Sequence, residues 1–154
     1  SEELFKLTKK YNAGLFLMHK RGTPKEMQKK LNPRANMVKE FDKFIEKRLK
    51  ILKKMKFNLK KVWFDPGIGF GKTLNQNLQL MRSLSKYSHK NLQILLGSSR
   101  KSWINFIDPS NADQRIGGSL ASITHALQQN VNTFRIHDVQ ETNQMIKVLK
   151  ALNK

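Results

Sequence analysis

Four short runs of apolar residues recur along the chain, at residues 14–18, 61–64, 92–96 and 133–137. Each run is largely continuous in hydrophobicity, without the strict alternation of a strand that has one wet face. Such runs are typical of parallel strands that are buried on both faces. The pattern therefore predicts four parallel strands.

Helical patterns fill the intervals between these runs. Apolar residues at helical spacing predict an amphipathic helix through residues 41–52. Its stripe consists of Phe41, Ile45, Leu49 and Leu52. Residues 77–87 and 116–129 are predicted as two further helices, and the first residues are helix-like as well. Because strands alternate with helices, we expect an α/β fold of parallel βα units with right-handed crossovers. No linker divides residues 1–154, so they are expected to form one domain.

Two helix starts carry capping signals. Thr23-Pro24-Lys25-Glu26 combines an N-cap residue, a proline at the first helical position and a glutamate at the capping-box position. Asp138 is followed three residues later by Glu141, which predicts a second capping box. The apolar stripe of that last helix consists of Met145, Val148, Leu149 and Leu152.

The chain is strongly basic, with a formal net charge of +19 from 30 lysines and arginines against 11 aspartates and glutamates. Such a charge can indicate a nucleic-acid partner. However, lysine supplies most of the cations and lies mainly on polar helix faces, and no aromatic residues are interleaved as in stacking platforms for single strands. Solvated helix faces explain the charge better, so no specific nucleic-acid partner is expected.

Other bulk features bear on location. The chain has no cysteine, which suits a reducing compartment. No apolar run approaches the roughly 20 residues that a helix needs to cross a bilayer. We therefore expect a cytoplasmic protein without a membrane partner.

The stretch FDPGIGFGKT, residues 64–73, nearly matches a phosphate-binding P-loop. It ends in Gly71-Lys72-Thr73, but Pro66 stands where the pattern requires its first glycine. Proline has no N–H to offer a phosphate and fixes its own φ, so it argues against a P-loop. The remaining feature is an acid, Asp65, at the end of a predicted strand, followed by glycines that allow a close backbone approach.

Polar residues gather just after the predicted strands. His19 follows the first strand, Asp65 the second and residues 97–101 the third, while Arg135 and His137 lie on the fourth. In parallel α/β folds this edge of the sheet is where ligands bind. Arg135 and His137 are two residues apart on a strand and should point the same way, so they are expected to share a buried, anionic ligand. His19 alone is expected to be a structural hydrogen-bonding residue.

Four stretches together resemble one family. LFLMHKRGTPKEMQ, FDPGIGFGKT, LGSSRKSWI and FRIHDVQET are similar to the signatures of dihydropteroate synthases, in the right order and spacing. The likeness covers the whole chain. It implies the C-terminal half of a TIM-type (β/α)8 barrel. It also implies an activity that joins 4-aminobenzoate to a dihydropterin methyl diphosphate, releasing diphosphate in folate biosynthesis, and that is a target of sulfonamides.

The resemblance also implies roles for the pterin and aminobenzoate pockets. Asp65 would accept hydrogen bonds from the amino-pyrimidine edge of the pterin, and Met18 would pack on the ring. The glycine-rich loop with Gly69 would approach the ring, and Phe70 would border the aminobenzoate. Lys101 would bond the pterin and help line the aminobenzoate pocket.

Further residues would serve the leaving group. Ser99 would lie beside Lys101, and Arg135 and His137 would hold the diphosphate together with Mg²⁺. Lys101, Arg135 and His137 are the residues expected to act in catalysis. The metal ligand, an asparagine, would lie in the missing N-terminal half, so no metal ligand is expected in this segment.

The chain departs from the family by its length, because four strands are present where the barrel needs eight. The chain also begins with Ser-Glu-Glu, already helix-like and without Met, which favours a fragment of a longer protein. Its partners would be the missing half and, when complete, a second copy in a homodimer. The isolated segment is expected to be inactive. Two alternatives stay open: a non-catalytic basic half-barrel that acts as a binding or interaction module, and a P-loop nucleotide hydrolase.

Overall fold

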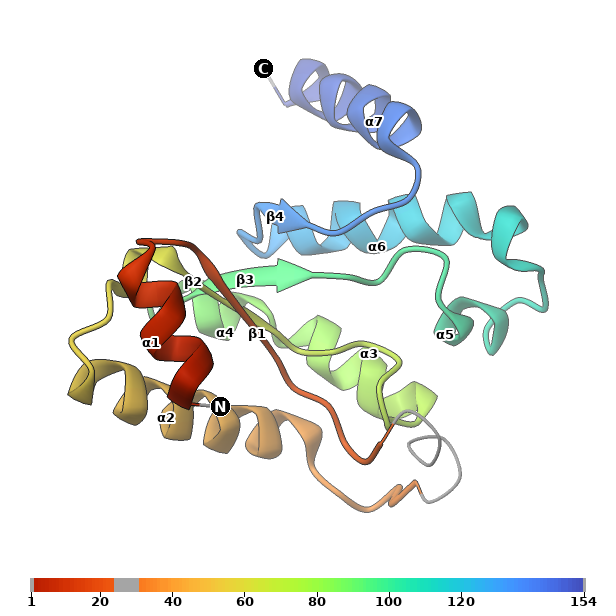
Figure 1. Ribbon diagram of the computed structural model, residues 1–154. Helices are drawn as coiled ribbons and strands as arrows, with labels where there is room; N and C mark the ends of the chain where they lie inside the picture. Colours follow the sequence, from red (N-terminus) through yellow and green to blue (C-terminus); the bar gives the residue numbers. More distant parts are fainter. Residues whose placement is uncertain (1, 24–30, 154) are drawn as a thin grey trace.

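The four predicted strands form one parallel sheet in the computed structural model, which describes residues 2–23 and 31–153 (Figure 1). The strands are β1 (Leu15–Met18), β2 (Val62–Asp65), β3 (Gln93–Leu96) and β4 (Thr133–Phe134). They are hydrogen-bonded in chain order, β1-β2-β3-β4, and every pair is parallel. The predicted α/β fold of parallel units is confirmed. The fourth strand is shorter than predicted, because it ends at Phe134.

Helices connect the strands. They are α1 (Glu2–Lys10), α2 (Met37–Lys54), α3 (Leu74–Arg82), α4 (Ser85–Ser88), α5 (Ser102–Asn105), α6 (Ile116–Gln128) and α7 (Val139–Leu152), with 3-10 turns at Leu59–Lys61 and Ala112–Arg115. Among the described residues, no helix combines the length and apolarity needed to cross a membrane. The predicted helix start at Thr23 continues into residues 24–30, which lie outside the described part of the chain.

The single helix predicted over residues 77–87 is wrong, because α3 ends at Arg82 and α4 begins at Ser85. Ser83 accounts for the break. Its amide donates to the Leu80 carbonyl, three residues back, and its hydroxyl donates to the Gln79 carbonyl at 2.8 Å. A tightened last turn of this kind is a common way for an α-helix to end.

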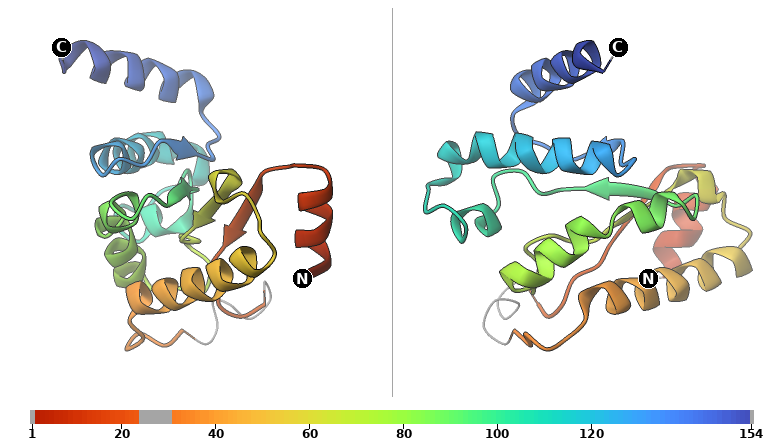
Figure 2. Two further views of the ribbon diagram at one scale, coloured as in Figure 1. Left: turned by 90° about the vertical axis from the view of Figure 1, so that its left-hand side faces the viewer. Right: turned by 180° about the vertical axis from the view of Figure 1, so that it is seen from behind.

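The order of the strands in the sheet distinguishes a doubly wound sheet from a barrel. In a doubly wound sheet the strand order reverses at a switch point and helices cover both faces. In a barrel each strand adds beside the last in one direction, so right-handed crossovers place every helix on the same face. The order seen here is the second kind, and in Figure 2 the connecting helices α2, α3 and α6 follow one another around one side of the strands.

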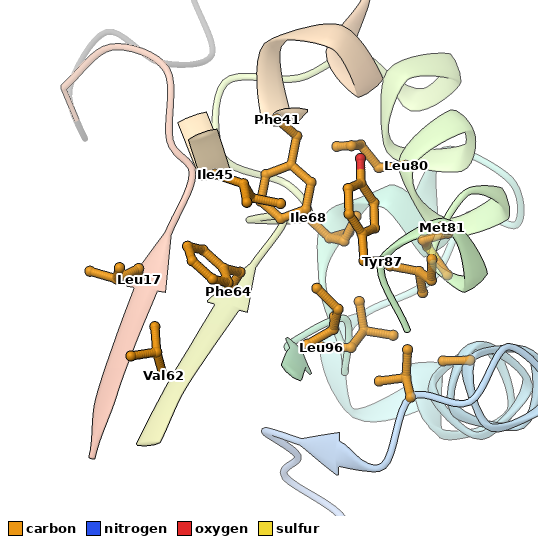
Figure 3. Close-up of a cluster of buried hydrophobic side chains, with 14 of the residues drawn as sticks. Leu17, Phe41, Ile45, Val62, Phe64, Ile68, Leu80, Met81, Tyr87 and Leu96 are labelled. Atoms are coloured by element: carbon orange, nitrogen blue, oxygen red, sulfur yellow. The ribbon is translucent and has the colours of Figure 1, made fainter. Parts of the chain in front are cut away.

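The helix-covered face of the sheet carries the hydrophobic core (Figure 3). Side chains at alternate strand positions point into it, and the helices add aromatic and aliphatic side chains from the other side. The labelled core residues are Leu17, Val62, Phe64 and Leu96 from the strands, Phe41 and Ile45 from α2, Ile68, Leu80 and Met81 from the β2–α3 segment and α3, and Tyr87 from α4. The predicted stripe of α2 is confirmed, since Phe41, Ile45 and Leu52 are buried.

The opposite face of the sheet is open in the described residues. Phe16 is 57% exposed, and its ring lies 5.1 Å from that of its register partner Trp63. The strands are therefore buried on one face only, as expected of a half-barrel that lacks its opposite wall. The sequence predicts that Phe16, Trp63, Ile94 and Phe134, or their neighbours, line the inner face. The register places Ile94 and Phe134 beside Phe64 and Leu96 on the helix-covered side.

The last helix, α7, buries less of its predicted apolar stripe than expected. Of the α7 residues, only Thr142 is buried, while Val148 and Leu152 are 52% and 77% exposed. The helix contacts α6, where Thr124 Oγ1 is 3.3 Å from Met145 Sδ, and it lies at the end of the molecule far from α2 (Figure 1). The predicted capping box is also wrong, because the Asp138 side chain makes no cap hydrogen bond and binds Arg100 instead.

A buried lysine holds the loop that follows β2. Lys72 Nζ donates to three backbone carbonyls, those of Gly67 at 2.9 Å, Phe70 at 3.1 Å and His19 at 3.1 Å. These bonds use all three donors of the ammonium group. Burial lowers the pKa of Lys72 to about 8. Because this lysine points into the loop, it does not form the cradle of a P-loop, and the nucleotide-hydrolase alternative loses its motif.

Glycines let the same loop press against the segment after β1. Gly67 has a φ of 65°, and a Cβ there would lie 1.9 Å from the His19 carbonyl oxygen. Gly71 has a φ of 69°, and a Cβ there would lie 2.5 Å from the Arg21 carbonyl oxygen. Both the left-handed backbone and the contact exclude a side chain. The close approach that the glycines allow is therefore to the chain itself at these two positions.

We expect Lys72→Met to loosen this loop locally. The substitution removes three donors and leaves buried carbonyls unpaired, although it also removes a buried charge. Amide hydrogen exchange should become faster in residues 67–70, where the Phe70 amide donates to Gly67, and stay unchanged in α2. Exchange measured by mass spectrometry checks this, with the exposed Lys60→Met as control. Equal protection of the loop in both variants would contradict the role given to Lys72.

The open face predicts association of the isolated chain. Unpaired strand edges and exposed apolar side chains are templates for contact with other chains, and positive charge opposes association without burying that surface. We expect self-association or loose packing, measured by light scattering and near-ultraviolet circular dichroism. Phe16→Gln should reduce the scattering more than Leu152→Gln, although Leu152 in α7 is the more exposed side chain, at 77% against 57%. A monomer with a cooperative melt and a rigid aromatic spectrum would refute the half-barrel architecture.

Candidate active site

Asp65 ends β2 on the open face of the sheet. It is 3% exposed and is the register partner of Met18, which is half-buried at the end of β1. Asp65 Oδ1 accepts a hydrogen bond from the Gly67 amide at 2.7 Å. The turn that starts the glycine-rich loop thus fixes one oxygen of the carboxylate.

Opposing effects set the charge state of Asp65. Burial raises the pKa of the carboxyl, whereas the Gly67 amide and the charges of Lys101, Arg135 and Lys72 lower it. The net direction is upward, so burial outweighs the hydrogen bond and the cations. Burial thus destabilises the ionised carboxylate. A ligand that donates hydrogen bonds to it would stabilise that form and should therefore bind well.

Lys101 reaches from the loop after β3 to the loop after β2. Its Nζ donates to the Ile68 carbonyl at 2.6 Å and lies 4.5 Å from the centre of the Phe70 ring. Its side chain also passes Gly69, where an added Cβ would be 3.5 Å from Lys101 Cδ. Burial lowers the pKa of Lys101 to about 8, although the charge of Asp65 opposes the shift. The structure therefore brings together the residues predicted for the pterin and aminobenzoate pockets.

Ser99 joins the third strand to the fourth. Its Oγ is 3.1 Å from His137 Nδ1 and accepts from the His137 amide at 3.4 Å. Ser99 is buried, whereas His137 is exposed. This contact positions the imidazole near the carboxyl ends of the strands.

Arg135 lies over the backbone of the third strand. A Cβ added to Gly97 would be 3.2 Å from Arg135 Nη2, so the missing side chain makes room for the guanidinium. The expected burial of Arg135 and His137 on a strand face is wrong, because β4 ends before them and both are exposed. Because both side chains are exposed, neither requires a buried counter-ion in the described chain.

His19 is structural, as expected, but through packing rather than through a side-chain hydrogen bond. Its ring packs against Phe41 and Phe44, with centroids 6.0 and 5.5 Å away. Within residues 2–23 and 31–153, its Nδ1 has no hydrogen-bond partner. Burial, followed by the charges of Lys72 and Arg21, lowers the pKa of His19 to about 4, so it is neutral at pH 7.

Two supporting residues were missed in the sequence. In the sequence, Lys72 is visible only as part of an incomplete P-loop pattern, and Asn77 only as a residue of a predicted helix. Asn77 is buried, and its Oδ1 accepts from the Gly69 amide at 2.8 Å while its Nδ2 donates to the Thr73 carbonyl at 3.0 Å. A local pattern cannot identify such residues, because their partners are backbone groups brought close by the loop.

Magnesium, which the family resemblance implies, finds no ligand cluster here. Within the part of the chain that the structure describes, no group of three His, Asp or Glu side chains could hold a metal ion. Hard divalent cations prefer several oxygen ligands, and Asp65 is the carboxylate among the candidate residues. The described residues therefore do not form a magnesium site by themselves.

The geometry suits one kind of ligand. One end of the site offers a fixed carboxylate acceptor beside a cation and an aromatic ring, and the other end offers the exposed Arg135 and His137. A molecule with a flat donor edge at one end and negative charge at the other would match both ends. The absent wall of the open face leaves such a molecule only half enclosed.

Comparison with known proteins places the chain among enzymes. Residues 1–137 match the family model described as pterin binding enzyme. The dihydropteroate synthase of Escherichia coli K12 is 35% identical over 136 residues, which are 88% of this chain and 48% of that protein. The bifunctional dihydropteroate synthase/dihydropteroate reductase of Helicobacter pylori is 34% identical over 154 residues, 100% of this chain and 40% of that protein.

Solved structures agree in fold. A Yersinia pestis dihydropteroate synthase with a sulfonamide drug complex superposes with a TM-score of 0.88 and 31% identity, over 96% of this chain and 54% of that one. The Thermus thermophilus enzyme in complex with 6HMPPP gives a TM-score of 0.88 and 29% identity, over 100% of this chain and 61% of that one. These relatives are TIM barrels, so the sheet is part of such a barrel. The chain spans about half the length of the curated relatives it matches. Over that span, it belongs to the family of pterin-binding enzymes.

Proposed function

We propose that this chain, as one partial domain, supplies the C-terminal half of a dihydropteroate synthase active site. The reaction joins 4-aminobenzoate to the methyl group of a dihydropterin methyl diphosphate and releases diphosphate. The observation that carries the proposal is the meeting of Asp65, Lys101 and Phe70 at the same strand ends as Ser99, Arg135 and His137. Relatives with that activity, one of them solved with 6HMPPP and another with pteroic acid, support it.

Asp65 binds the amino-pyrimidine edge of the pterin in this proposal. An ionised carboxylate accepts two hydrogen bonds from adjacent N–H groups, which gives orientation as well as affinity. The Gly67 amide holds one oxygen in place before the ligand arrives, at 2.7 Å. Met18, the register partner of Asp65, supplies an apolar surface beside the ring.

Lys101 and Phe70 form the junction between the two substrates. The ammonium group lies 4.5 Å from the ring centre and is held by the Ile68 carbonyl. From there it can donate to the pterin and border the aminobenzoate, with Gly69 leaving room along its stem. The contact with Phe70 keeps the loop after β2 and the loop after β3 in one arrangement.

Arg135 and His137 bind the leaving diphosphate. When the carbon–oxygen bond to diphosphate breaks, negative charge builds up on the leaving oxygen and a pterin-methyl cation remains, which the aromatic amine captures with loss of a proton. Fixed cations stabilise the developing charge without reorganising in the reaction. Gly97 gives the guanidinium its place, and Ser99 gives the imidazole its orientation.

Further elements stay predictions that rest on the family resemblance. Mg²⁺ would add positive charge at the diphosphate, but its ligands would come from residues outside this chain. Homodimerisation of the complete protein and a cytoplasmic location are likewise predicted. The same resemblance implies that sulfonamides act on the complete protein.

We expect the chain alone to form no dihydropteroate, because half of the pocket wall is missing. Paired with the part of the Escherichia coli synthase that precedes the matched 136 residues, it should gain measurable activity. Product formation by the chain, by that part and by the pair checks this. Activity of the chain alone would refute the requirement for a second half. If the pair forms a stable complex that binds pterin but has no activity, the non-catalytic binding module is the better description.

Asp65→Asn should weaken pterin binding in that pair by about 1–3 kcal/mol, the usual cost of an unsatisfied buried group. The amide retains one oxygen for the Gly67 N–H, so the loop keeps its shape, but it presents donors to the donors of the pterin. Calorimetric titration with a dihydropterin measures the loss. The exposed Asp113→Asn, in the 3-10 turn before α6, serves as the charge-matched control. Unchanged pterin affinity in Asp65→Asn would exclude the role of Asp65.

The same titration should depend on pH. Because burial raises the pKa of Asp65, its carboxylate becomes protonated at a higher pH than an ordinary aspartate does. Pterin affinity should therefore be present above that raised pKa and be lost as the pH falls through it. The Asp65→Asn variant should lack this dependence.

A further inference from the structure

One ion pair joins the two loops that carry half of the candidate residues, Ser99, Lys101, Arg135 and His137. Arg100 lies in the loop after β3, between Ser99 and Lys101, and Asp138 directly follows His137 after β4. Arg100 Nε donates to Asp138 Oδ2 at 3.0 Å, and Arg100 Nη2 pairs with Asp138 Oδ1. Such a two-point contact fixes both the distance and the angle between the groups.

The backbone of Arg100 is also held from other elements. Its φ is 56°, a left-handed conformation that is unfavourable for a residue with a side chain. Its amide donates to Ser119 Oγ at 2.9 Å, and its carbonyl accepts from Arg115 Nη1 at 2.9 Å. A strained residue persists where the surrounding contacts over-determine it, and such residues cluster at functional sites.

This conformation sends three successive side chains to three different partners. Ser99 reaches His137, Arg100 reaches Asp138, and Lys101 reaches the Ile68 carbonyl in the loop after β2. Arg100, which has no proposed role in the pocket, thus lies between two residues that have one, Ser99 and Lys101. In the segment after β4, Asp138 directly follows His137.

We propose that Arg100 and Asp138 are positioning residues, which together set the distance and orientation between Lys101 and the Ser99–His137 contact. Their importance for turnover rests on the proposed function, whereas their effect on the imidazole does not. Besides this pair, the contact between Ser99 and His137 joins the loops after β3 and β4. Misplacement of a catalytic group by about 1 Å can cost about a hundredfold in rate.

A merely structural salt bridge is the competing description. The side chain of Arg100 is 31% exposed, and partly exposed pairs contribute little to stability. A pair of that kind would change the melting temperature slightly and the site not at all. The ion pair between Lys86 and Asp42, on α4 and α2, provides a matched case away from the strand ends.

The first measurement uses this chain alone and follows the His137 imidazole by long-range ¹H–¹⁵N spectra. Arg100→Gln and Asp138→Asn should shift its signals toward those of Ser99→Ala, in which the Nδ1 contact is removed. Lys86→Gln should leave them unchanged. Imidazole signals identical to the parent chain in both single variants would overturn the proposal.

The second measurement uses the pair with the Escherichia coli segment. Each single variant should lower kcat by about tenfold to a hundredfold with little change in KM for the dihydropterin. The swapped variant, Arg100→Asp with Asp138→Arg, should recover part of the loss, since aspartate tolerates the left-handed conformation. The proposal would be overturned if both single variants had the kcat of the unmodified pair. It would also be overturned if Lys86→Gln lowered kcat as much as they do. If the unmodified pair forms no dihydropteroate, the proposed function fails, and the imidazole spectra still decide on Arg100 and Asp138.

Discussion

The whole arrangement depends on one constraint, the repeated right-handed crossover between neighbouring parallel strands. Because each strand is added on the same side of the last, every connecting helix falls on one face and every strand ends at one edge. The covered face is stabilised by burial of Leu17, Phe64 and Leu96 against α2, α3 and α4. Within residues 2–23 and 31–153, no connecting helix covers the other face, so polar side chains such as Asp65 can point into a common space.

Burial and charge then compete within that space. The site holds a carboxyl whose pKa is raised and two lysines, Lys72 and Lys101, whose pKa values are lowered to about 8. In each case burial is the largest cause, and neighbouring opposite charges only reduce the shift. Burial of these ionisable groups at the strand ends therefore lowers the stability of the folded protein. Backbone carbonyls and amides, rather than counter-ions, are the partners that keep them in place.

Much of this could be predicted from the sequence, but not all. Short apolar runs located the strands, and an acid after such a run located Asp65, because both signals are local. Continuous apolar runs, however, do not show which residues face the helices, so the sequence does not decide between Ile94 or Phe134 and their neighbours for the inner face. The sequence around Asp138 matches a capping box, yet its carboxylate binds the distant Arg100 instead. Only the fold decides between a cap hydrogen bond and this ion pair. Lys72 and Asn77 gave no signal, since their partners are main-chain atoms of a folded loop.

The two tryptophans of the chain lie in opposite environments. Trp103 is buried, and its indole N–H donates to the Ser98 carbonyl at 3.0 Å, so its surroundings are set by the folded chain itself. Trp63 lies on the open face against Phe16, where its surroundings depend on whatever closes that face. The protein thus carries two intrinsic fluorophores with separate meanings. Emission from Trp103 reports whether the loop after β3 is folded, and emission from Trp63 reports whether the inside of the barrel is wet or dry.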